Sequence, residues 1–149
     1  MADLETIFAR AWLRDSPLHG EAHWRAVAAT GQELVDSGSG GDPAVVRWFG
    51  LLHDTRRVNE SHDPEHGPRA AAFARELHAE GLLRVDEAQL ELLSLAIELH
   101  ADGQTSSHPT VGTCWDSDRL HLGRVGIVID PELLSTQQAR DRVVAERGL

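Results

Sequence analysis

The chain has 149 residues and a formal charge of −10, from 14 basic and 24 acidic residues, and 41% of its residues are hydrophobic. This size fits one globular domain over residues 1–149. Every basic residue is an arginine, which excludes chemistry that needs a lysine, such as a Schiff base or a phosphate-binding P-loop.

The charge and the cysteine content limit the partners and the compartment. An acidic chain repels polyphosphate backbones, which argues against general nucleic-acid binding but allows a small phosphorylated ligand held by a few arginines or by a metal. The single cysteine, Cys114, has no partner for an intrachain disulfide. No signal-peptide pattern is present, and the apolar stretches are far shorter than the roughly 18 residues of a bilayer span. We therefore expect a cytoplasmic protein without a membrane segment.

Apolar residues at helical spacing, together with start and stop signals, predict an all-α fold. Asp42 and Pro43 suit the start of a helix, and Gly81 suits the end of one. The segment 126–129 is the one candidate strand, and the Gly/Ser-rich stretch 37–41 is too short to separate two domains. We expect a compact bundle of about six or seven helices, over residues 4–14, 19–35, 42–53, 64–81 or 68–81, 87–100, 113–122 and 131–146.

Nine histidines are a surplus for a chain of this length. A residue that lies three, four, seven or eight positions from apolar neighbours shares their face of a helix. His23, for example, precedes Val27 by four residues and Leu34 by eleven. By this spacing, four histidines lie on the core-facing stripes of four different helices: His23, His53, His66 and His100.

Two aspartates accompany these histidines. Asp54 directly follows His53, and Asp118 is four residues from Cys114 and from Leu122 on an apolar stripe. Because buried charge is costly unless it is paired or bound to metal, imidazoles and carboxylates from separate helices indicate a metal site in the core. Spacing alone leaves open whether Asp116 or Asp118 is the ligand.

The other five histidines are expected to have structural or surface roles. His19 lies at a helix start, where it is a cap neighbour or part of a pocket wall. The remaining four are expected on the solvated surface or in loops: His78, His121, His62 and His108.

An ordered set of motifs runs through residues 19–126. His23 stands in His-Trp-Arg-Ala-Val, His53 and Asp54 in Gly-Leu-Leu-His-Asp-Thr-Arg-Arg, and Asp118 in Cys-Trp-Asp-Ser-Asp-Arg-Leu. This order resembles the HD-domain superfamily of metal-dependent phosphohydrolases, whose pattern is an early His, a His-Asp pair that closes a helix, and a late Asp. In many members the late motif continues as Asp-Ala-Asp-Arg-Leu-Asp, whereas this chain has Ser117 and His121 at two of those places.

The resemblance implies a site for two metal ions. The branch that holds two metals has an additional His after the pair and another before the late Asp, and His66 and His100 match those positions. Imidazole and carboxylate ligands select Mn, Fe, Co, Ni or Zn over an ion that prefers oxygen ligands alone. The implied ligand set is His23, His53, Asp54, His66, His100 and Asp118.

The implied activity is the hydrolysis of a nucleotide or another small phosphate ester. Bound dications lower the pKa of water and neutralise phosphate oxygens, so Asp54 becomes a catalytic residue through the metals that it holds. Arg57, three residues after Asp54, resembles the phosphate-holding branches of the family, and Arg119 or Arg56 could assist it. Asp63 is expected to cap a helix at Pro64 rather than to orient a leaving group.

Two other functions remain open at this point. A few proteins of this fold use a di-iron centre to activate oxygen, and the same ligands would serve. Alternatively, the domain is a regulatory module that binds a nucleotide or a metal without turnover.

Overall fold

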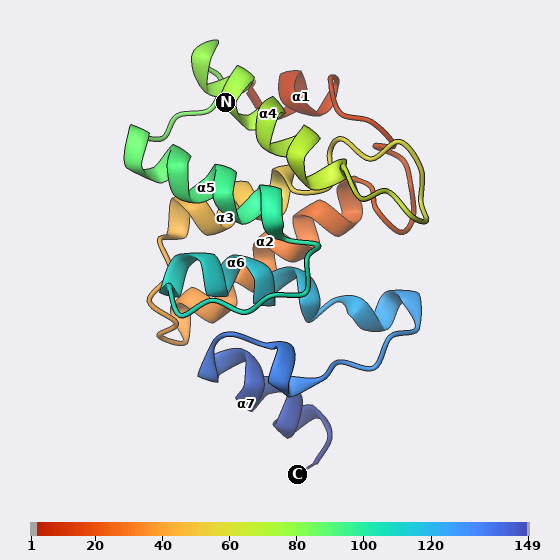
Figure 1. Ribbon diagram of the computed structural model, residues 1–149, viewed down its shortest axis with the longest axis vertical. Helices are drawn as coiled ribbons and strands as arrows, with labels where there is room; N and C mark the ends of the chain where they lie inside the picture. Colours follow the sequence, from red (N-terminus) through yellow and green to blue (C-terminus); the bar gives the residue numbers. More distant parts are fainter. Residues whose placement is uncertain (1–2, 149) are drawn as a thin grey trace.

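The computed structural model describes residues 3–148, which contain seven α-helices and two short 3-10 helices (Figure 1). These residues contain no β-strand, which confirms the all-α expectation. The helices are α1 Asp3–Phe8, α2 Glu21–Asp36, α3 Pro43–Leu52, α4 His66–Ala79, α5 Glu87–Leu99, α6 Pro109–Arg119, η1 Leu122–Val125, η2 Pro131–Leu133 and α7 Gln137–Glu146.

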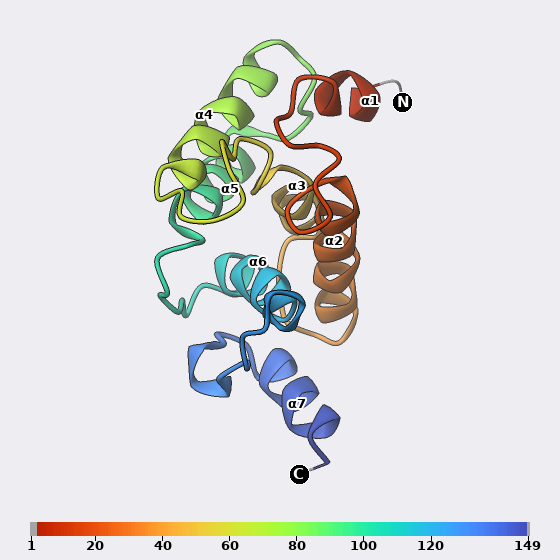
Figure 2. The same cartoon turned by 90° about the vertical axis from the view of Figure 1, so that its right-hand side faces the viewer.

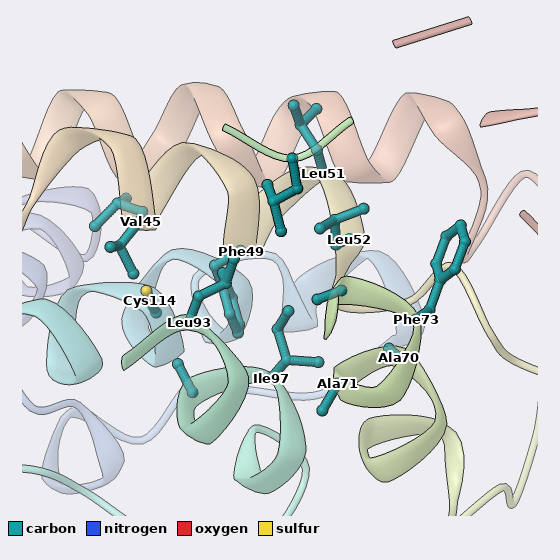
Figure 3. Packing of buried hydrophobic residues seen from close by; sticks show 14 of the residues in the cluster. Val45, Phe49, Leu51, Leu52, Ala70, Ala71, Phe73, Leu93, Ile97 and Cys114 are labelled. Atoms are coloured by element: carbon teal, nitrogen blue, oxygen red, sulfur yellow. The ribbon is translucent and has the colours of Figure 1, made fainter. Parts of the chain in front are cut away.

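The helices pack around one main core. α2 lies beside α3, α4 lies beside α5, and α6 contacts α2, α3 and α5. Phe49 from α3 and Leu93 and Ile97 from α5 are fully buried in this core (Figure 3). α7 lies beyond α6 at the C-terminal end of the molecule, where it contacts η2 (Figure 2). Within residues 3–148, no helix combines the length and apolar character needed to cross a bilayer.

Two glycines allow neighbouring helices to approach closely. A Cβ at Gly50 of α3 would lie 2.5 Å from the backbone nitrogen of Ala28 in α2. A Cβ at Gly67 of α4 would lie 2.6 Å from the carbonyl oxygen of Glu98 in α5. The backbones of these two helix pairs therefore lie closer than a methyl group permits.

Local capping explains where the expected helices begin and end. The Asp42 carboxylate accepts the backbone N–H groups of the first turn of α3, and Pro43 occupies the first helical position. Asp86 and Gln89 form a reciprocal capping box at the start of α5. Gly81, with a φ of +78°, follows α4 as expected.

The first two helices are shorter than the spacing predicted. α1 ends at Phe8 rather than at Arg14, because the chain leaves the helix to pair with another segment. The Trp12 N–H donates to the carbonyl oxygen of Thr55 at 2.8 Å, and Leu13 has a φ of +54°. A turn follows, and α2 begins at Glu21 rather than at residue 19.

The predicted bounds of the last helices were also wrong. α6 spans Pro109–Arg119 rather than 113–122, because the His108 ring accepts the Thr110 N–H and caps a helix whose first residue is a proline. The expected helix 131–146 divides into η2 and α7, and α7 has its own cap in Thr136. The segment 126–129 is a loop, not a strand, and it begins where Gly126 adopts the left-handed conformation.

The expected cap at Asp63 was wrong as well. The carboxylate of Asp63 accepts the Val58 N–H at 2.8 Å and pairs with Arg69 at 2.5 Å. α4 begins at His66, between the two predicted starts, and the preceding Glu65 makes no side-chain cap. Asp63 therefore stabilises the loop between α3 and α4 and does not cap a helix.

Candidate metal centre

The side chain of Asp54 lies at the centre of a group of histidines, and its two carboxylate oxygens face different pairs. Oδ2 lies 3.5 Å from Nε2 of His23 and 3.5 Å from Nε2 of His53. Oδ1 lies 3.3 Å from Nε2 of His66 and 3.5 Å from Nε2 of His100. Asp54 therefore belongs to two groups of potential metal ligands, and each group contains two imidazoles.

Asp118 completes the first group. Its Oδ1 lies 3.3 Å from Nε2 of His23 and 3.2 Å from Nε2 of His53. The alternative, Asp116, is fully buried elsewhere, where its carboxylate accepts the backbone N–H groups of residues 135 and 136. The structure therefore places Asp118, and not Asp116, among the histidines.

Helix ends bring these side chains together, as the sequence pattern predicted. Each of these side chains lies in a terminal turn of a helix or directly beyond it, so five helices contribute to one centre. His23 is in the first turn of α2, His53 and Asp54 follow α3, His66 opens α4, His100 follows α5, and Asp118 is in the last turn of α6.

Backbone carbonyls orient three of the rings. Nδ1 of His53 donates to the carbonyl oxygen of Gly50 at 2.9 Å. Nδ1 of His66 donates to the carbonyl of Asp63 at 2.5 Å, and Nδ1 of His100 donates to that of Ile97 at 2.6 Å. In neutral imidazole this leaves the lone pair on Nε2, the atom that faces Asp54. Metal-bound histidines are typically oriented in this way.

The Nε2 atoms are better arranged to bind a cation than to form hydrogen bonds with one another. Nε2 of His66 lies 2.9 Å from Nε2 of His100, and each ring already uses its Nδ1 hydrogen elsewhere. Two lone pairs at this distance repel unless positive charge lies near them. Nε2 of His23 and Nε2 of His53 are buried and have no hydrogen-bond partner within residues 3–148. This donor set fits transition-metal ions.

The charges at the centre favour cations. Burial lowers the pKa of His23, but the Asp118 and Asp54 carboxylates outweigh burial and hold this pKa above its ordinary value. Burial raises the pKa of Asp54, but the surrounding imidazoles, His53 foremost, lower it well below the usual range. The buried carboxylates therefore stay ionised and attract positive charge.

A cavity of about 370 Å³ opens onto the centre. Asp54, His66, His100 and Asp118 line one end of it, beside three arginines: Arg57, Arg119 and Arg124. Nε of Arg57 lies 3.7 Å from Oδ1 of Asp54. Nε of Arg57 and Nη2 of Arg119 are buried without a hydrogen-bond partner within residues 3–148. The cavity therefore combines potential metal ligands with guanidinium groups that have unused donors.

Sequence reasoning missed one residue at the centre, Arg124, and only partly foresaw another, His19. His19 is a wall of the cavity, and its Nδ1 lies 3.6 Å from Oδ2 of Asp54. Arg124 reaches the cavity from η1, and its Nε donates to the carbonyl oxygen of Leu18 at 3.0 Å. No helical spacing points to either position, because both depend on contacts between distant segments: His19 lies 35 residues before Asp54, and Arg124 lies 106 residues after Leu18.

Other expectations need correction. His121 is half-buried rather than on the surface, and its Nε2 lies 2.8 Å from Oγ1 of Thr30. His78 is half-buried and hydrogen-bonds the carbonyl oxygen of Val85. Arg56 is outside the cavity, with its guanidinium 3.9 Å from the ring centre of Phe73. His62 and His108 are exposed, as expected.

Comparison of the chain with protein-family models, with curated proteins and with solved structures gives no match. The resemblance to the HD domain therefore rests on the motifs themselves.

Proposed function

We propose that this protein is a metal-dependent phosphohydrolase of the HD type that hydrolyses a small phosphate ester at a two-metal centre. The observation that carries the proposal is the position of Asp54. Its two oxygens face separate histidine pairs at the end of a cavity with three arginines. A carboxylate that belongs to both groups of potential ligands would fit a two-metal hydrolytic site.

The residues divide into two ligand groups in this proposal. One ion would be held by His23, His53, Asp118 and Asp54, and the other by His66, His100 and Asp54. The donors suit Mn, Fe, Co, Ni or Zn. When bound, two such ions would make water a better nucleophile near neutral pH and would neutralise charge on the phosphate.

The arginines bind the phosphate group. The unpartnered donors of Arg57 and Arg119 line the cavity beside Asp54, where they can hydrogen-bond phosphate oxygens in a charge-assisted manner. In the reaction, the oxygen of water forms a bond to phosphorus, and the bond from phosphorus to the alcohol oxygen breaks. The alcohol oxygen takes up the proton that water loses. A monoester gives an alcohol and inorganic phosphate, and a diester gives an alcohol and a monoester.

The experiment is a substrate panel on protein of known metal content. We expect the chain loaded with Mn, Fe, Co, Ni or Zn to hydrolyse p-nitrophenyl phosphate or bis(p-nitrophenyl) phosphate, and chelation to abolish the activity. Absence of hydrolysis with every ion would overturn the proposal. In that case, oxygen consumption by the iron-loaded protein would indicate an oxygenase, and tight nucleotide binding without turnover would indicate a regulatory module.

A matched pair of variants tests the role of the arginines. Arg57→Ala removes the guanidinium next to Asp54, whereas Arg47→Ala removes an exposed guanidinium from α3, outside the cavity. We expect the first change to weaken phosphate binding while the metal content is retained, and the second to leave hydrolysis unchanged. Equal behaviour of the two variants would remove Arg57 from the site.

A further inference from the structure

We propose that the cavity selects phosphate esters whose alcohol part is an aliphatic chain rather than a nucleoside. This inference rests on the proposed function, because the phosphate group is placed at the metal centre. It extends that function to the class of substrate.

The cavity wall away from the metal centre is aliphatic. Its side chains come from residues 122–134, which run from the start of η1 to the residue after η2: Leu122, Val125, Ile127, Val128, Ile129, Leu133 and Leu134. Three of them are unusually exposed for their type, namely Val128 at 82%, Ile127 at 50% and Leu133 at 48%. Exposed aliphatic side chains that line a cavity with a polar end are typical of a site for an amphipathic small molecule.

The same wall has few groups that recognise a nucleoside. Within residues 3–148, no Phe or Trp lines the cavity, and no Ser, Thr, Asn or Gln does so. Apart from the potential metal ligands, Asp130 is the one acidic side chain on the described lining, and its carboxylate accepts the Glu132 N–H. Proteins that read bases stack them on aromatic rings and hydrogen-bond their edges. An aliphatic chain needs neither of these.

The polar and aliphatic parts of the lining are joined. Nη1 of Arg119 donates to the carbonyl oxygen of Leu133 at 2.8 Å, so this guanidinium adjoins the aliphatic wall. Arg124 lies in η1, between the wall residues Leu122 and Val125. A phosphate bound between Arg57, which adjoins Asp54, and Arg119 therefore lies between the potential metal ligands and the aliphatic side chains.

The test measures binding of alkylphosphonates, from methyl to hexyl, to the Mn-loaded protein by calorimetry. Their carbon–phosphorus bond is not an ester, so binding is measured without hydrolysis. Burial of a methylene is worth about 0.8 kcal/mol, so we expect the affinity to rise about fourfold for each added methylene. We also expect adenosine 5′-monophosphate to bind more weakly than hexylphosphonate. A flat series, or tighter binding of the nucleotide, would overturn the inference.

A matched pair of variants locates the effect. Leu133 lines the cavity at 48% exposure, and Leu95 of α5 lies outside it at 45% exposure. We expect Leu133→Asn to reduce the ratio of hexyl to methyl affinity by about fivefold or more, and Leu95→Asn to leave the ratio unchanged. An unchanged ratio in Leu133→Asn protein that retains its helical circular dichroism would contradict the assigned wall.

Hydrolysis of methyl and hexyl phosphate by the same protein separates the two proposals. If hydrolysis occurs but the phosphonate series is flat, the proposed function stands and the aliphatic specificity is wrong. If affinity rises with chain length but no ester is hydrolysed with any ion, the specificity of the cavity stands and the proposed function is wrong.

Discussion

Gly67→Ala should remove one of the two expected metal ions without changing any ligand. Gly67 directly follows His66, and a Cβ at this position would lie 2.6 Å from the carbonyl oxygen of Glu98, two residues before His100. This distance is about 0.8 Å short of the 3.4 Å at which ordinary contact begins. The carbonyl oxygen of Glu98 belongs to the backbone and cannot turn aside as a flexible side chain can. The start of α4 must therefore move away from the end of α5.

That movement is large on the scale of metal coordination. Metal–ligand distances tolerate deviations of about 0.2 Å, so a displacement of several tenths of an ångström disrupts the pair His66 and His100. The pair His23 and His53 comes from α2 and from the end of α3, and it is not displaced directly. The overpacked helix contact should also lower the free energy of unfolding by about 1–3 kcal/mol.

The assay is elemental analysis of parent and variant after loading with Mn, together with thermal unfolding. We expect two ions per chain in the parent and one in Gly67→Ala. The control is Gly123→Ala, because a Cβ at Gly123 meets nothing within 4 Å. If Gly67→Ala binds two ions with parental affinity, the close approach of α4 and α5 does not set the geometry of the second pair, and the reasoning is refuted.

Four further outcomes are expected. Asp54→Asn removes the charge shared by the two ligand groups, so bound metal and hydrolysis should fall together; full metal content in this variant would exclude Asp54 as the bridge. Arg57→Ala should keep both ions and raise KM for a phosphate ester about tenfold or more, as steady-state kinetics will measure. Asp116→Asn weakens hydrogen bonds to residues 135 and 136 and should lower the free energy of unfolding by about 2–3 kcal/mol in denaturant titrations, with metal content unchanged. Because the pKa of His23 is raised, protons compete with metal there, and calorimetry in two buffers should detect tighter binding and less proton release as pH rises.

The sequence predicted which histidines meet at the centre, because helical periodicity relates position along the chain to position around a helix. His23, His53, His66 and His100 each follow the apolar stripe of their own helix, and packing these stripes into one core brings the four rings together. Spacing alone did not decide between Asp116 and Asp118, although the apolar stripe favoured Asp118. The fold distinguishes the two aspartates, because the hydroxyl of Thr136, the cap of α7, donates to the carboxylate of Asp116.

The sequence did not establish the parts of the site that lie outside the α-helices. It left His19 as a cap neighbour or part of a pocket wall and gave Arg124 no role, because a turn and a four-residue 3-10 helix have no long repeat to extrapolate. The segment 126–129 has the composition of a strand, but without a partner strand it became a wall of the cavity. Gly67 gave no signal either, because its importance lies in the carbonyl oxygen that faces it from α5.

The most direct test of the two-metal centre is a crystal structure of protein grown with Mn, with anomalous scattering used to locate the ions. We expect two peaks about 3.5 to 4 Å apart, with Oδ1 and Oδ2 of Asp54 on different ions and one histidine pair on each. A single ion held by all four histidines, or ions bound away from Asp54, would contradict it.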